Sequence, residues 1–258
     1  MNFVKGDLGK RASRIKRAVT WGTDLVLGVV GLGFLKSEIQ RISALPHDIN
    51  NYAYIGLLVA VLLLMGGWIL VAHKESDIIG EWLDPLGYTP PDEMLVALGF
   101  ALILVALVYA SRNAVAFGIV YSVYAMGNLF AVIHLRRQME VIIGGSRKQL
   151  AEEPPETAPT WEKAIDVLDT FYLKRPNIER VAGTLVFGVV GLVLSLRARC
   201  APDGKLELYA FFVYSASVVL LEGVVMFFWR GKFYGGIRRV ETEWYAYKRR
   251  TPSQTTEK

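Results

Sequence analysis

The sequence contains one cysteine, three histidines and none of the short motifs that mark soluble enzymes. Because the single thiol of Cys200 cannot form an internal disulfide, a disulfide-stapled fold is excluded. No H-E-x-x-H, C-x-x-C or G-x-S-x-G pattern is present, and we expect no metal site. An enzymatic role is therefore the least supported class of function, behind transport and assembly.

Apolar residues are what the chain has in excess. Hydrophobic residues make up 53% of the sequence, charged residues 21%, and the mean hydropathy is +0.33. Several apolar runs approach the roughly 20 residues with which a helix crosses a ~30 Å hydrocarbon layer. Such runs must be helical in lipid, because a helix satisfies its own backbone amides. The sequence therefore predicts an all-α, polytopic integral membrane protein and excludes an ordinary cytosolic enzyme.

Charged residues divide the apolar sequence into six candidate transmembrane helices, which we expect to pair as three hairpins. The first contains Asp24 and has no small-x-small cleavage site after it, so we interpret it as a span and not as a signal peptide. The six predicted spans are residues 18–35, 52–72, 94–111, 114–135, 181–196 and 207–229.

The lysines and arginines predict the orientation of these spans. With six spans, 23 of the 29 basic residues fall on one side, which places both termini in the cytoplasm or its organellar equivalent. The net charge of +5 is then a consequence of topology, and we expect membrane lipids as partners and no nucleic acid.

Short polar segments separate the hairpins and are expected to carry interfacial amphipathic helices. The predicted order is a basic interfacial segment (1–17), hairpin one (18–72), an amphipathic loop helix with hairpin two (73–135), a cytoplasmic Pro-rich loop with an amphipathic helix (136–180), hairpin three (181–229) and a basic aromatic tail (230–258).

An internal repeat is a further hypothesis. The segment LVLGVVGL at 25–32 recurs as LVFGVVGL at 185–192, and the spans that follow share a Tyr-Ala-aromatic start. Apolar helices also resemble one another by chance, so both explanations stay open; a true repeat would relate the copies by an axis along the membrane normal. The glycines in these segments have the small side chains that let helices approach closely, and we assign them to helix packing: Gly28, Gly31, Gly188 and Gly191.

A layer of polar side chains inside the spans is the candidate site. Asp24, Asn128 and Glu222 each follow or precede a basic span boundary by seven or eight residues, which places them roughly 10–12 Å below the same surface. An acidic side chain at the centre of a span costs about 2.5–3.5 kcal/mol on insertion scales, so we expect these groups to face the bundle interior. The six predicted spans contain no lysine or arginine, so we expect no basic side chain to neutralise these acids. The other predicted members are Thr184, Ser215, Tyr214 and Tyr121.

Two functions follow from these features. The polar layer favours a channel or carrier for a proton, a cation or a small solute. The missing catalytic motifs favour a non-catalytic membrane subunit, in a homo-oligomer or with unlike chains. Haem held between His73 and His134 would suit the geometry of two neighbouring spans, but neither histidine has an acidic partner nearby, and we expect no cofactor.

Overall fold

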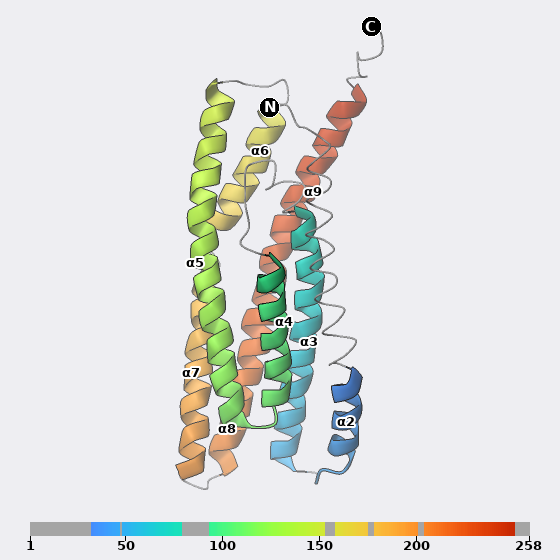
Figure 1. Cartoon of the computed structure of the whole chain (residues 1–258), viewed down its shortest axis with the longest axis vertical. Helices are drawn as coiled ribbons and strands as arrows, with labels where there is room; N and C mark the ends of the chain where they lie inside the picture. The colour runs from blue at the N-terminus through green and yellow to red at the C-terminus, as the bar shows by residue number, and fades with distance from the viewer. Residues whose placement is uncertain are drawn as a thin grey trace.

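The computed structural model describes residues 32–46, 48–78, 93–152, 158–174, 178–200 and 204–250, and the residues it describes in regular structure are all helical. Ten helical segments follow one another in this described part of the chain (Figure 1). They are α2 (Leu32–Ser43), α3 (Ile49–Ile78), α4 (Glu93–Ala110), α5 (Ala114–Glu152), α6 (Ala158–Asp169), the π-helix η4 (Thr170–Lys174), α7 (Ile178–Cys200), α8 (Gly204–Ala216), the π-helix η5 (Ser217–Val225) and α9 (Met226–Arg250).

Within the described residues, four helical segments are long and apolar enough to cross a membrane. They comprise Ile49–Trp68, Ala114–Glu152, Trp161–Cys200 and Lys205–Glu243. Three of them contain a span predicted from the sequence, and Ile49–Trp68 overlaps the predicted span at 52–72. The predicted span at 94–111 corresponds to α4, while most of the predicted span at 18–35 lies outside the described residues. The all-helical, apolar character of the fold is thus confirmed, and the six-span count and the repeat stay predictions.

Two helices continue well beyond the predicted ends of their spans. Helix α5 has 39 residues and is therefore about 58 Å long, almost twice the hydrocarbon thickness. The α8, η5 and α9 segments follow one another without a break from Gly204 to Arg250. The boundaries drawn at residues 135 and 229 thus fall inside continuous helices. The reason is that a basic residue ends an apolar run without ending a helix, since Arg and Lys are good helix formers.

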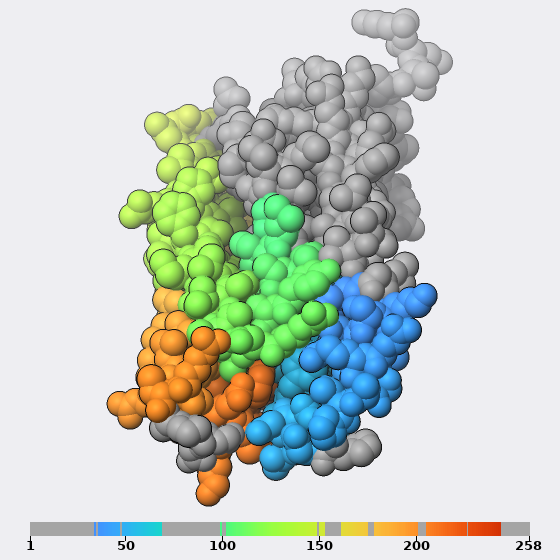
Figure 2. All heavy atoms as spheres, turned by 60° about the horizontal axis from the view of Figure 1, so that its bottom comes forward, coloured from blue at the N-terminus to red at the C-terminus, as the bar shows by residue number. Residues whose placement is uncertain are grey.

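The lower part of the molecule is a helical bundle. Helix α5 packs along α7, α7 along α8, and α3 along α8. The end of α2, the start of α3, the α4–α5 turn, the end of α7 and the start of α8 all lie at the same end of this bundle (Figure 1). Viewed toward that end, the blue surface of α2 and α3 adjoins the green surface around the α4–α5 turn, with orange α7 beyond it (Figure 2).

Glycines allow the closest contact in the bundle. The Tyr214 ring of α8 lies against Gly191 of α7, where a Cβ would come within 2.3 Å of the ring atom Cε1. The hydroxyl of the same tyrosine lies against Gly118 of α5, where a Cβ would be 2.1 Å away. No side chain larger than hydrogen fits at either position unless Tyr214 moves. These two glycines therefore let the completely buried Tyr214 ring fit between α5 and α7.

A second apolar core lies above the bundle, between the upper part of α5, α6 and α9. Its buried side chains come from the predicted Pro-rich loop with an amphipathic helix (136–180) and from the predicted basic aromatic tail (230–258). They are Met139, Ile143, Ile165, Leu168, Phe233 and Ile237. Ion pairs flank it, among them Lys163 Nζ to Glu243 Oε2 at 2.6 Å and Arg147 Nη2 to Asp169 Oδ2 at 3.1 Å. We call this packed unit the helical extension.

Candidate functional site

A buried ion pair lies at the centre of the candidate site. Arg180, in the first turn of α7, pairs through Nη1 with Oε2 of Glu222 in η5. The two side chains are 4% and 0% exposed. Transferring two charges out of water costs several kcal/mol for each ion, and the cost is recovered only when geometry and further hydrogen bonds are good.

Further hydrogen bonds reach the same carboxylate from two other groups. Thr184 Oγ1 donates to Glu222 Oε1 at 2.7 Å, and the Tyr124 hydroxyl donates to Glu222 Oε2 at 3.2 Å. The Tyr124 hydroxyl in turn accepts a hydrogen bond of 2.7 Å from Trp68 Nε1. Side chains of α5 and α7 therefore contact this carboxylate of η5, and α3 is linked to it through Tyr124. We call this network the Glu222 centre.

The local backbone explains why these side chains converge. Arg180 and Thr184 are four residues apart and so lie on one face of α7. Glu222 belongs to a π-helical segment whose buried residues are Ser217, Val218 and Glu222. A π-helical turn hydrogen-bonds residue i to i+5, so its wider turn brings Ser217 and Glu222 to the same inward side. Such segments are rare and occur frequently at functional sites.

A row of buried hydroxyl groups leads from the Glu222 centre toward the far end of α7. The Tyr121 hydroxyl shares a hydrogen bond of 2.9 Å with Ser217 Oγ, and Tyr214 shares one of 3.3 Å with Ser195 Oγ. The rings are in contact too: Tyr121 stacks on Tyr124 with centroids 5.9 Å apart and meets Tyr214 edge-on at 6.3 Å. We call Ser195, Tyr214, Tyr121, Ser217 and Tyr124 the hydroxyl row.

The structure brings together part of the polar layer predicted from the sequence. Thr184 contacts Glu222 directly, while Tyr121 and Tyr214 belong to the hydroxyl row. Asn128 is buried, but its Nδ2 has no hydrogen-bond partner within the described part of the chain. Ser215 is half-buried and takes no part in the contacts of Glu222.

Three predicted residues lie outside the described residues, namely Asp24, Gly28 and Gly31. Of the other packing glycines, Gly188 faces Ser122, whose Oγ would lie 3.2 Å from an added Cβ.

Of the two histidines considered as haem ligands, only His134 has a described side chain. His134 is exposed and its ring stacks on Phe130 at 6.4 Å, and the side chain of His73 is outside the described part. Among the described residues, no group of three His, Cys, Asp or Glu side chains is placed to hold a metal ion.

The expectation that no basic side chain neutralises the polar layer is wrong. Arg180 was assigned to the cytoplasmic loop because it precedes the apolar run that begins at Val181. In the structure its side chain is buried against Glu222. A pattern in the sequence does point to it: Thr184, Gly188, Gly191 and Ser195 form one buried face of α7, and Arg180 extends that face by one turn.

Comparison with protein-family models, curated proteins and solved structures found no match to this chain.

Proposed function

We propose that the chain is an integral membrane protein with six spans in three hairpins and both termini on the cytoplasmic side. Four apolar helices long enough to cross a membrane support this proposal, as does the distribution of 23 of the 29 basic residues to one side. Reporter fusions test it. Fusions at Ala44, Asn113 and Asp203 should report the outer side and fusions at Pro85, Pro155 and Thr251 the inner side; one fusion on the opposite side overturns the six-span arrangement.

We infer that the protein carries protons across that membrane. The observation that supports this inference is the row of buried hydroxyl groups that ends at a carboxylate paired with an arginine. A hydroxyl group both donates and accepts a hydrogen bond, so each hydrogen-bonded pair of the row can pass a proton across it, and a conformational change has to join one pair to the next. Glu222 is the group at the end of the row that can hold the proton.

The surroundings of Glu222 favour a proton over a metal cation. Cations such as Ca²⁺ and Mg²⁺ need several oxygen ligands at once. Both oxygens of Glu222 already accept hydrogen bonds, and the guanidinium of Arg180 in contact with Oε2 repels a second cation. A proton needs only one lone pair, which Oε2 offers whenever the hydrogen bond from the Tyr124 hydroxyl opens.

Protonation of Glu222 also supplies a conformational step. The neutral acid no longer holds the guanidinium of Arg180, so the contact between α7 and η5 weakens. Loss of the proton restores the pair. The hydroxyl row is interrupted between its hydrogen-bonded pairs, since Tyr121 contacts Tyr124 and Tyr214 through its ring faces and edges. We therefore propose a carrier that changes conformation in each cycle, in preference to an open pore.

The test is proton flux into liposomes that contain the purified protein and a pH-sensitive dye. Tyr121→Phe removes one hydroxyl and keeps the ring, so the fold should survive while flux falls. Glu222→Gln combined with Arg180→Gln removes the proton acceptor without leaving a single buried charge. Asp24→Asn tests the remaining acid of the predicted layer. The matched control is Glu207→Gln. Glu207 is an exposed acid in α8, which continues directly into the η5 segment that carries Glu222.

We expect flux close to that of the wild type for Glu207→Gln, and flux close to that of empty vesicles for the Arg180→Gln/Glu222→Gln variant. The transport proposal would be overturned if proton flux were the same in four preparations: the wild type, Tyr121→Phe, Arg180→Gln/Glu222→Gln and empty vesicles.

The alternative is a non-catalytic subunit of a larger membrane complex. It is favoured by one observation: Arg180, Thr184 and Tyr124 all donate to the Glu222 carboxylate, which suits a group that locks α7 to η5 and α5. Native mass decides between the two functions. A discrete homo-oligomer favours the carrier, whereas unlike chains that co-purify in fixed ratio favour the subunit.

A further inference from the structure

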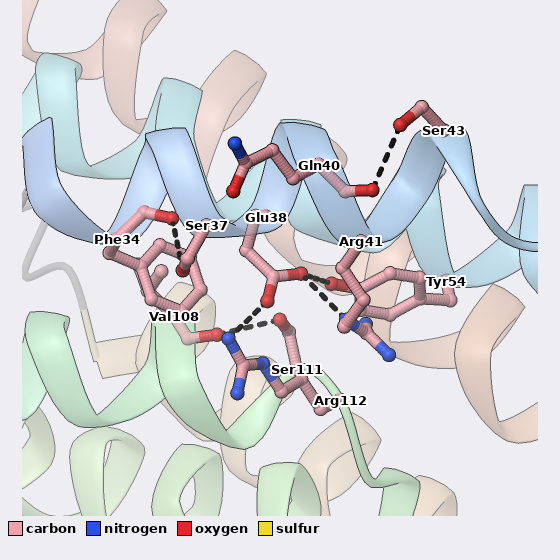
Figure 3. Close-up of polar contacts among 10 residues, drawn as sticks. All are labelled: Phe34, Ser37, Glu38, Gln40, Arg41, Ser43, Tyr54, Val108, Ser111 and Arg112. Carbon is pink, nitrogen blue, oxygen red and sulfur yellow. Dashed lines mark hydrogen bonds and ion pairs between the residues drawn. The ribbon is translucent and has the colours of Figure 1, made fainter.

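A second buried carboxylate lies at the opposite end of the bundle from the helical extension. Glu38 of α2 is 1% exposed, and three side chains surround it (Figure 3). The Tyr54 hydroxyl of α3 donates to its Oε2, and Arg41 Nε donates to the same oxygen at 3.2 Å. Arg112, in the α4–α5 turn, pairs with Oε1 through Nη2.

This cluster carries a net positive charge. Burial opposes the ionisation of Glu38, but the hydrogen bonds from Tyr54 and Arg41 and the charges of Arg41 and Arg112 outweigh it and hold the pKa of the carboxyl below its ordinary value. Glu38 is therefore ionised at neutral pH and neutralises one of the two arginines. One positive charge is left over.

Aromatic rings hold both guanidinium groups in place. The Arg41 Cζ atom lies 4.8 Å from the centroid of the Tyr54 ring, and the Arg112 Cζ atom lies 5.1 Å from that of Phe34 and 5.8 Å from that of Tyr109. The Arg41 and Arg112 side chains are nevertheless 39% and 38% exposed. Each arginine is thus fixed on one side by a ring and by Glu38 while part of it still meets the surroundings, a geometry that suits a phosphate oxygen.

Apolar side chains continue from this cluster along α4. Tyr109 and Leu102 are 48% and 58% exposed, and they lie between Arg112 and the middle of the bundle. Leu102 lies eight residues before the end of α4 at Ala110, which is about 12 Å of helix. In the proposed membrane orientation, the arginines lie at the depth of the lipid headgroups and the exposed apolar side chains at the depth of the acyl chains.

We propose that Arg41 and Arg112 bind the phosphate of an anionic phospholipid, whose acyl chain lies along Tyr109 and Leu102 of α4. The leftover positive charge favours an anionic headgroup over a zwitterionic one, because the ammonium of a zwitterionic headgroup is repelled by the same arginines. The apolar side chains favour a lipid over free phosphate. The proposal rests on the membrane insertion proposed above and not on proton transport.

The test is the thermal unfolding midpoint of the detergent-purified full chain with three additions: phosphatidylglycerol, phosphatidylcholine with the same acyl chains, and inorganic phosphate. We expect phosphatidylglycerol alone to raise the midpoint. Glu38→Gln removes the internal neutralising charge and should enlarge that rise. Glu38→Gln combined with Arg41→Gln and Arg112→Gln removes all three charges of the cluster, so no buried carboxylate is left without a counter-charge and no leftover positive charge remains, and the rise should be lost. The matched control is Arg197→Gln, an exposed arginine at the same end of the bundle, which should behave as the wild type does.

Three outcomes would overturn the proposal. An equal rise with phosphatidylcholine would show that headgroup charge is irrelevant, and an equal rise with inorganic phosphate would assign the site to a free oxyanion. A full rise in the Glu38→Gln/Arg41→Gln/Arg112→Gln variant would place the lipid elsewhere. Because the midpoint is measured in detergent without any proton flux, a failure here leaves the transport proposal standing, and a failure of flux leaves this one standing.

Discussion

Arg180 and Glu222 are separated by 42 residues in the chain, yet their side chains form an ion pair that is almost completely buried. The pair joins the first turn of α7 to the π-helical segment η5. Tyr124 and Trp68 extend the same network of hydrogen bonds to α5 and α3. One carboxylate therefore connects four of the helical elements and determines how they meet.

Removing one partner of this ion pair should lower the free energy of unfolding. We expect Arg180→Gln to lower the free energy of unfolding by about 3–5 kcal/mol, because it leaves the Glu222 carboxylate buried without a counter-charge. The double variant Arg180→Gln/Glu222→Gln should recover most of that loss, since it leaves no charge behind. Unfolding in mixed micelles, followed by circular dichroism, measures both. The control Arg197→Gln, on the exposed face of α7, should change stability by about 0.5 kcal/mol or less. A single variant as stable as the wild type would contradict the burial of the pair.

The Tyr214 ring makes Gly191 sensitive to the smallest substitution. Gly191→Ala places a Cβ 2.3 Å from the ring atom Cε1, so we expect a loss of about 1–3 kcal/mol from overpacking. The matched control is Gly144→Ala in α5, where an added Cβ meets nothing within 4 Å. That change should stabilise the helix by about 0.5–1 kcal/mol, because alanine favours helix over glycine. Equal effects of the two substitutions, measured in the same unfolding assay, would argue against the close contact of α7 and α8.

The Glu38 cluster should make stability depend on acid pH. Because the pKa of Glu38 is lower in the folded protein than its ordinary value of 4.5, its ionised form stabilises the fold above pH 4.5, and this contribution is lost as the pH falls through the folded pKa. Glu38→Gln should therefore narrow the difference in unfolding free energy between neutral pH and acid pH. The control Glu140→Gln, an exposed acid of α5, should leave the pH dependence as it is in the wild type. An unchanged slope in Glu38→Gln would contradict the lowered pKa.

The helical extension should depend on its apolar core and little on its surface charges. Phe233 is 3% exposed and stacks on Phe171 with ring centroids 4.0 Å apart, so we expect Phe233→Ala to cost about 3–5 kcal/mol. Lys163→Ala breaks an exposed ion pair with Glu243 and should cost about 1 kcal/mol or less. Limited proteolysis of the two variants in detergent provides the measurement, with faster cleavage between α5 and α9 expected only for Phe233→Ala. Equal cleavage rates would show that the extension does not fold around this core.

Much of the fold is predictable because apolar length and helical spacing are local properties. A helix satisfies its own backbone groups, so an apolar run of sufficient length identifies a helix without knowledge of its neighbours. The same argument identifies Glu222 and Thr184 as inward-facing, since charged and polar side chains within such a run avoid lipid. The helices continue past the predicted span boundaries at residues 135 and 229, because charge ends an apolar run and not the backbone hydrogen bonding of a helix.

The sequence by itself determined that the chain is helical and apolar and that an acid lies inside one of its helices. Only the tertiary structure decided which partners that acid has. Arg180 stands at the edge of an apolar run and looks like a surface residue, and the π-helical turn that carries Glu222 has no marker in the sequence. Glu38 likewise lies just outside an apolar run. Its burial depends on Tyr54 and Arg112 from two other segments. The physical reason is that a buried charge is tolerated only where counter-charges from distant segments converge, and that convergence is set by the packing of whole helices.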